Sequence, residues 1–170
     1  LAQTPGATVR VNVEFDAEVR TTSNVFAETP KGRADNVVMV GAHLDSVDEG
    51  PGINDNGSGS AALLEVAEKM RKVNVRNKVR FAWWGAEERG LVGSDHYVFG
   101  LTDEERDAIA LYLNFDMVAS PNYVRFIYDG DGSAFGLAGP PGSDVIEALY
   151  EDFYRARGLE WEPTEISFRS

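Results

Sequence analysis

The stretch "NVVMVGAHLD" (residues 36–45) combines a nearly continuous apolar run with a polar end. A strand with apolar residues at almost every position suits a parallel sheet that is covered on both faces. This run delivers His43 and Asp45 at its C-terminal side. Open parallel sheets bind their ligands along that edge. The stretch therefore predicts a covered, mainly parallel sheet with functional side chains at the end of a strand.

Two other stretches repeat this pattern of a buried strand with acidic residues after it. They are "VRFAWW" (residues 79–84), followed by two glutamates, and "LYLNFD" (residues 111–116). Between the first two strands, Leu63 begins an apolar series at i, i+3, i+4 and i+7, which is typical of a helix with one buried face. Strands that alternate with helices indicate an α/β fold. We expect a three-layer sandwich, with helices flanking a central mixed, mainly parallel β-sheet.

Weaker signals extend this prediction to the rest of the chain. Apolar alternation predicts a strand at residues 9–15, and further strands are expected at Val25–Glu28, at residues 123–128 and from residue 165 onwards. Thr102 and Glu105 form a capping-box pattern that opens a short helix. Ser143 is expected to cap a last helix, which stops at Gly158. At 170 residues the chain is expected to form a single domain over residues 1–170.

Composition excludes several classes of function. The formal net charge of −12 repels phosphate backbones and anionic lipid surfaces, so we expect no nucleic-acid partner. No stretch approaches the roughly 20 apolar residues that span a bilayer. The chain has no cysteine, which excludes disulfides, thiolate zinc sites and cysteine nucleophiles within it. It also lacks the lysine of a phosphate-binding loop and the Gly-x-Ser-x-Gly turn of serine hydrolases.

The predicted strand ends gather acidic side chains without a compensating lysine. The cluster consists of Asp45, Asp55, Glu87, Glu88 and Asp116, with His43 as its one imidazole. Two carboxylates about 4 Å apart repel each other by about 4 kcal/mol at an effective dielectric constant of 20. That is a large part of the roughly 5–15 kcal/mol by which a typical domain is stable. The cluster therefore predicts bound divalent cations.

The residue types narrow the choice of metal and suggest a role for several side chains of the cluster. One imidazole with carboxylates and no thiolate suits Zn²⁺, Co²⁺ or Mn²⁺. Asp45 can accept the second ring N–H of His43 and so fix which nitrogen faces the metal. Only one of the two adjacent glutamates is needed as a ligand, so we assign Glu88 to the metal and Glu87 as a general base. Alternatively, Asp55 belongs to an ordinary "NDNG" turn and the two glutamates to a solvated helix start.

Several of these stretches together resemble the M28 family of zinc metallopeptidases, in particular its secreted bacterial aminopeptidases of the Streptomyces type. They are "VVMVGAHLDSVDEGPGINDNGSGSAALLEVA", "VRFAWWGAEERGLVGSDHYV", "LYLNFDMVASPNY" and the terminal "FRS". The resemblance implies the zinc exopeptidase fold, two Zn²⁺ ions and a peptide substrate with a free N-terminus. It also implies that the protein is secreted or located at the cell surface.

The resemblance also implies a role for each residue of the cluster. His43 matches a ligand of one zinc, Glu88 a ligand of the other, and Asp116 the remaining aspartate ligand. Asp55 matches the bridging aspartate, which a cis peptide bond follows in the family. Glu87 matches the general base, and Asp45 the carboxylate that orients the histidine. Glu87 and Asp116 are further implied to hold the α-amino group of the substrate, and Arg169 to position the substrate.

One ligand of the family has no counterpart in the sequence. The family supplies a final histidine ligand far downstream, whereas this chain stops at Ser170 and its only other histidine, His96, matches no ligand position. We therefore expect a domain that is incomplete at its C-terminus and completed by a missing segment or a second chain. Two alternatives stay open: another M28-like amidohydrolase, such as a carboxypeptidase or a glutaminyl cyclase, and a non-catalytic fragment or inactive homologue.

Overall fold

The computed structural model describes residue 8 and residues 10–166. Contacts divide the chain into two compact units, Leu1–Ala119 and Ser120–Ser170. The first unit contains the sheet that carries the acidic cluster, and the second is a smaller α/β unit. The single domain expected over residues 1–170 stays a prediction.

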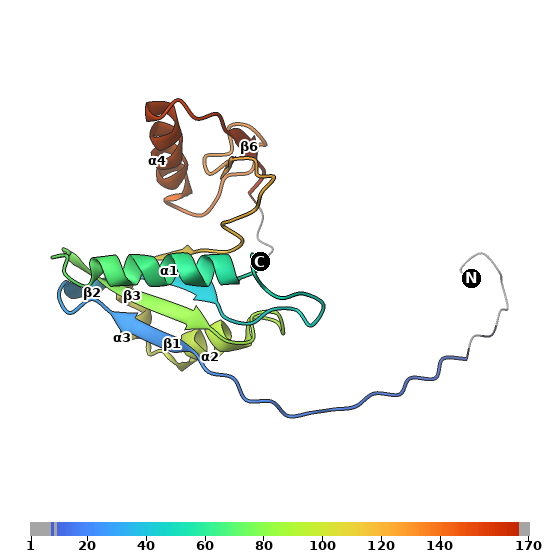
Figure 1. Ribbon diagram of the computed structural model, residues 1–170. Helices are drawn as coiled ribbons and strands as arrows, with labels where there is room; N and C mark the ends of the chain where they lie inside the picture. Colours follow the sequence, from blue (N-terminus) through green and yellow to red (C-terminus); the bar gives the residue numbers. More distant parts are fainter. Residues whose placement is uncertain (1–7, 9, 167–170) are drawn as a thin grey trace. The chain divides into compact units, whose positions relative to one another are not determined.

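The sheet of the first unit has four strands in the order β1-β3-β2-β4. Figure 1 shows β1 beside β3 in this sheet. These are β1 (Val25–Glu28), β2 (Arg33–His43), β3 (Asn77–Trp84) and β4 (Ile109–Asn114). The central strand β2 is parallel to both β3 and β4, while β1 is antiparallel to β3. The predicted mixed, mainly parallel sheet is confirmed, and each of the three stretches contributes a strand to it. The residues of β2 and β3 are mostly buried toward their C-terminal ends. The burial predicted for the third stretch is wrong, because β4 is the edge strand of the sheet and is largely exposed.

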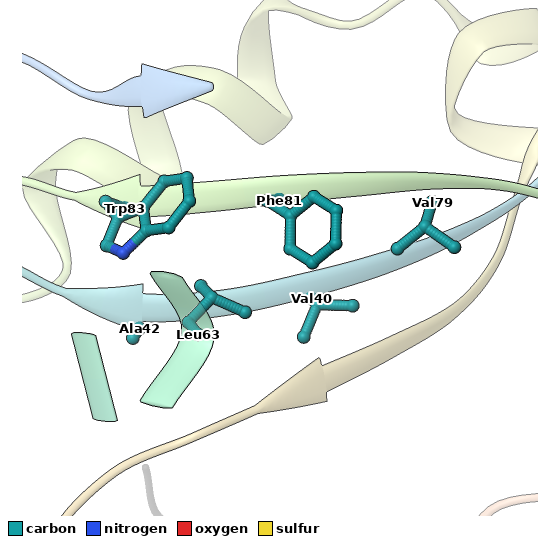
Figure 2. Packing of buried hydrophobic residues seen from close by; sticks show 6 residues of the cluster. All are labelled: Val40, Ala42, Leu63, Val79, Phe81 and Trp83. Atoms are coloured by element: carbon teal, nitrogen blue, oxygen red, sulfur yellow. The ribbon is translucent and has the colours of Figure 1, made fainter. Parts of the chain in front are cut away.

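Successive side chains of β2 and β3 point to opposite faces of the sheet, and each face is covered by a helix. Val40 and Phe81 pack with Leu63 of α1 (Gly57–Met70) on one face, where Figure 2 shows their side chains turned toward one another. On the other face, Met39, Ala82 and Trp84 pack against Tyr97 of α2 (Val92–Gly100). The two covered faces explain why these strands read as continuous apolar runs.

The short helix α3 (Asp103–Asp107) begins with the predicted capping box. The Thr102 hydroxyl accepts the backbone N–H of Glu105, and the Glu105 carboxylate accepts the N–H of Thr102. This reciprocal pair satisfies two N–H groups that a helix start would otherwise leave without partners.

The second unit pairs β5 (Phe126–Tyr128) in parallel with β6 (Glu162–Thr164) and contains α4 (Ser143–Ala156). The carboxylate of Asp129 is fully buried and accepts the backbone N–H groups of Ala134 and Phe135. These bonds close the turn that follows β5. Among the residues that the structure describes, none of the helices combines the length and the apolar character needed to cross a bilayer.

Three local predictions are wrong. The strand predicted at residues 9–15 is absent from the described residues: residues 10–24 form no strand, and Val11 and Phe15 are 75% and 83% exposed. An alternating apolar pattern does not produce a strand without a neighbouring strand to pair with. Residue 9 lies outside the described residues. Residues 165 and 166 follow β6 (Glu162–Thr164) and belong to no strand, and the rest of the strand expected there lies outside the described residues. Ser143 is the first residue of α4 rather than its cap, and Gly142, with a φ of 96°, occupies the cap position.

Candidate metal centre

The acidic cluster lies where β2, β3 and β4 end side by side. His43 is the last residue of β2 and is paired in register with Trp84, the last residue of β3. Phe115 continues the ladder after β4 by donating its N–H to the carbonyl oxygen of Gly41. The parallel register therefore brings Glu87 and Asp116 to the same edge as His43, as the sequence predicted.

His43 lies at the centre of this edge and is only 3% exposed. Its Nδ1 lies 3.0 Å from the backbone oxygen of Asp45. A carbonyl oxygen can only accept a hydrogen bond, so Nδ1 carries the proton and the Nε2 lone pair points the other way. Nε2 lies 3.0 Å from Oδ1 of Asp55 and 3.6 Å from Oδ2 of Asp116.

When only Nδ1 carries a proton, Nε2 and the carboxylate oxygens around it are all acceptors, so the short distances between them are not hydrogen bonds. Nε2 is buried without a hydrogen-bond partner, and the same is true of Oε1 of Glu88. A lone pair facing a carboxylate at 3.0 Å requires a positive charge nearby, either a metal cation or a second ring proton. The cluster thus contains two buried acceptor atoms, Nε2 of His43 and Oε1 of Glu88, without hydrogen-bond partners.

The structure brings all five predicted carboxylates to this edge, and several of them form sets suited to a cation. One set of close ligand atoms joins His43 with Asp55 and Asp116, and another joins His43 with Glu87 and Glu88. Within each set the ligand atoms lie within 4.8 Å of one another. The peptide bond between Asp55 and Asn56 is cis, as the family resemblance implies. Arg169 lies outside the described residues, and His96 is an exposed residue of α2.

Asp45 has a different role from the one the sequence suggested. Its carboxylate was expected to accept the ring N–H of His43, but the backbone oxygen accepts it, and the carboxylate lies 3.6 Å away. The carboxylate oxygens of Asp45 instead accept the backbone N–H groups of Glu87, at 2.9 Å, and Glu88, at 3.1 Å. Asp45 therefore holds the backbone that carries the two adjacent glutamates.

The turn at Gly85 and Ala86, just before these glutamates, is also held by Asn24, the residue that precedes β1. Ala86 has a φ of 56°, a left-handed conformation that non-glycine residues seldom adopt. Asn24 accepts the N–H of Gly85 and donates its side-chain amide to the carbonyl oxygen of Gly93. Sequence reasoning missed Asn24, because an isolated polar residue before a short strand carries no recognisable signal.

The carboxyl group of Glu87 is a weaker acid than that of a solvated glutamate. Partial burial raises the pKa of its carboxyl group above the usual value. A charge on His43 would oppose this rise, whereas the neighbouring carboxylates, Glu88 first, add to it. Both desolvation and like charges disfavour the ionised form, so Glu87 binds a proton more readily than a solvated glutamate does.

The donor set fits zinc. Nitrogen and oxygen ligands bind zinc at about 2.0–2.2 Å, and in a tetrahedral site they are therefore about 3.3 Å apart. The distances from Nε2 of His43 to Asp55 and Asp116, 3.0 Å and 3.6 Å, lie on either side of that separation. The proton on Nδ1, donated to the Asp45 backbone, gives His43 the tautomer that zinc-binding histidines adopt when Nε2 faces the metal.

The sequence pattern of peptidase family M28 matches residues 24–168. The chain is 62% identical over 169 residues to an aminopeptidase of Pseudomonas aeruginosa, covering 99% of this chain and 32% of that protein. It is 55% identical to leucine aminopeptidase 2 of Trichophyton equinum, covering 95% of this chain and 33% of that protein. The chain thus spans about a third of the length of the curated relatives it matches.

Solved structures show the same fold. A zinc aminopeptidase from Bacillus subtilis superposes with a TM-score of 0.65 at 29% identity, covering 82% of this chain and 33% of that one. An aminopeptidase from Aneurinibacillus sp. strain AM-1 gives a TM-score of 0.57 at 29% identity, covering 82% of this chain and 38% of that one. With most of its length matched by the family pattern, the chain belongs to peptidase family M28.

Proposed function

We propose that this chain carries the catalytic centre of a two-zinc aminopeptidase that releases N-terminal residues from peptides. The observation that carries the proposal is the buried Nε2 of His43, which has no hydrogen-bond partner and faces two carboxylates. The aminopeptidase activity named for the relatives from Pseudomonas and Trichophyton supports the choice of reaction.

The proposal has two metal positions, as the family resemblance implies. His43, Asp55 and Asp116 would hold one ion, since their ligand atoms form one compact set. Glu88 would hold the second ion, and Asp55 would be a ligand of both ions. The Oε1 atom of Glu88, which is buried without a hydrogen-bond partner, supports the assignment of Glu88. Zinc in such a site acts as a Lewis acid that acidifies water and polarises a carbonyl group.

The remaining groups supply proton transfer and substrate binding. Glu87 would take a proton from the attacking water and return it to the nitrogen of the departing peptide, as a general base next to the ligand set. Its Oε2 lies 3.9 Å from Nε2 of His43, at the margin of the ligand set rather than within a hydrogen bond. Glu87 and Asp116 would together hold the positively charged α-amino group, which limits the reaction to free N-termini.

The substitution Glu87→Gln tests the assignment of the base. The amide keeps the size of the side chain but cannot take a proton, so hydrolysis of leucine p-nitroanilide should fall by about 10²–10⁴-fold. The zinc content should stay at the wild-type value, because Glu87 is not assigned as a ligand. Turnover that persists in this variant would show that another group is the base.

The amine requirement and the location need separate tests. The N-acetylated form of the same nitroanilide should not be hydrolysed, and equal rates for both forms would point to a different amidohydrolase. We also propose, from the family resemblance, that the protein acts outside the cell or at its surface. Activity measured in culture medium and in cell lysate of the source organism checks this, and activity confined to the lysate would contradict it.

A further inference from the structure

Three polar side chains near the start of α1 contact the segment that carries Asp116. Asn56 donates its side-chain amide to the carbonyl oxygen of Phe115 at 2.9 Å. The Ser58 hydroxyl accepts the N–H of Val118 at 3.1 Å, and Oδ1 of Asn54 accepts the N–H of Ala119 at 3.1 Å. We call Asn54, Asn56 and Ser58 the polar brace.

The brace joins two segments that are far apart in the sequence, at positions next to both predicted ligands. Asn54 and Asn56 are the residues on either side of Asp55. Their partners lie on both sides of Asp116, from Phe115 to Ala119. Each bond therefore acts within a few residues of a carboxylate that faces Nε2 of His43.

The central residue of the brace is buried, and both polar atoms of its side chain have hydrogen-bond partners. Asn56 is 2% exposed, and its side-chain oxygen also accepts the N–H of Gly59, which caps α1. Gly59 has no room for a Cβ atom, which would collide with the Phe115 carbonyl oxygen and with Asn56. The helix start and the Phe115 backbone are thus in direct contact, and the Asn56 amide links them.

We propose that the polar brace is a set of positioning residues that fixes the separation of Asp55 and Asp116 before metal binds. This inference rests on the proposed function, because it assigns the brace to the same metal site. None of the three side chains needs to touch the metal or the substrate. Without the brace, both carboxylates would still be present, but the distance between them would vary. Zinc would then bind more weakly, because ordering the two carboxylates costs free energy.

Two variants separate the brace from the helix cap. Asn56→Ser keeps a good capping acceptor for Gly59 but is too short to reach the Phe115 carbonyl oxygen. Ser58→Ala removes the acceptor for Val118 and leaves Asn56 untouched. Thr29→Val is the matched control. Thr29 is also buried, and its hydroxyl also joins two backbone segments, but at the start of β3, the opposite end of that strand from the site.

The experiment measures zinc affinity of the whole chain by competition with a chromophoric chelator, alongside unfolding in urea. Asn56→Ser and Ser58→Ala should each bind zinc about tenfold more weakly than wild type, the lower end for changes next to metal ligands. Thr29→Val should lose stability but keep wild-type affinity. Brace variants with wild-type affinity, or a control that loses as much, would overturn the proposal.

A double-mutant cycle tests whether the effect passes through Asp116. If it does, Asn56→Ser should weaken zinc binding in the wild-type background and have almost no further effect in the Asp116→Ala background. Equal losses in both backgrounds would show that Asn56 does not act through the position of Asp116 and would overturn the proposal. A wild-type protein that binds no zinc would instead refute the metal centre itself, and with it the proposed function.

Discussion

Replacing Asp45 by asparagine separates two roles for this side chain. The sequence suggests that its carboxylate orients His43, whereas the structure shows the carboxylate holding the backbone N–H groups of Glu87 and Glu88. Asparagine keeps one side-chain acceptor and replaces the other by an N–H₂ group, which cannot accept. It also leaves the backbone oxygen of Asp45, and therefore the proton position on His43, unchanged.

The size of the effect follows from the lost bond. A hydrogen bond to a charged group contributes about 1.5–3 kcal/mol. The Asp45 side chain is 26% exposed, so water can partly replace that bond, and we expect Asp45→Asn to lower the free energy of unfolding by about 1–2 kcal/mol. The amount of zinc bound per chain should not change. Urea unfolding and metal analysis of the purified variant measure the two quantities.

Asp48→Asn is the control, because Asp48 lies in the same loop and pairs with Arg89 at the surface. Exposed ion pairs of this kind contribute little to stability, so this variant should behave as wild type. If Asp45→Asn instead loses zinc while its stability is unchanged, the carboxylate acts on His43 and our interpretation of the structure is wrong.

Two further predictions concern the fold. Leu63→Ala removes a side chain that is 1% exposed from the face between α1 and the sheet, and should cost about 2–5 kcal/mol in urea unfolding; a cost under about 1 kcal/mol would contradict the packing in Figure 2. Burial disfavours the charge of Glu28, but hydrogen bonds from Arg80 and Lys78 outweigh it and lower its pKa from 4.5. Its ion pairs therefore stabilise the fold above pH 4.5 and lose that effect as the pH falls. Wild type should be more stable than Glu28→Gln at pH 7, and this difference in the free energy of unfolding should shrink toward pH 3. A difference that stays constant between pH 7 and pH 3 would refute this.

The sequence identified the sheet and the acidic edge because both depend on patterns that survive without tertiary detail. Continuous apolar runs occur where a strand is covered on both faces, and "NVVMVGA" and "VRFAWW" occupy that position in β2 and β3. The parallel direction of these strands was enough to place His43 and Glu87 at one edge. The apolar alternation at residues 9–15 was misleading, since period alone does not supply a partner strand.

The arrangement inside the site could not be predicted from the sequence. The pattern His-x-Asp is compatible with a contact through the side chain or the backbone of Asp45, and only coordinates distinguish them. The stretch "NDNG" by itself is typical of a turn, yet polar residues of this region contact the segment after β4, about 60 positions away in the chain. A long-range hydrogen bond of this kind leaves no periodic signal in the sequence.

The most direct test of the metal centre is anomalous diffraction from crystals grown with excess zinc, recorded on both sides of the zinc absorption edge. We predict two peaks at the end of β2, one of them about 2.0–2.2 Å from Nε2 of His43 and from oxygens of Asp55 and Asp116. Glu88 should contact the other peak. Crystals that show no anomalous density among these side chains, or zinc bound only elsewhere on the molecule, would contradict the account.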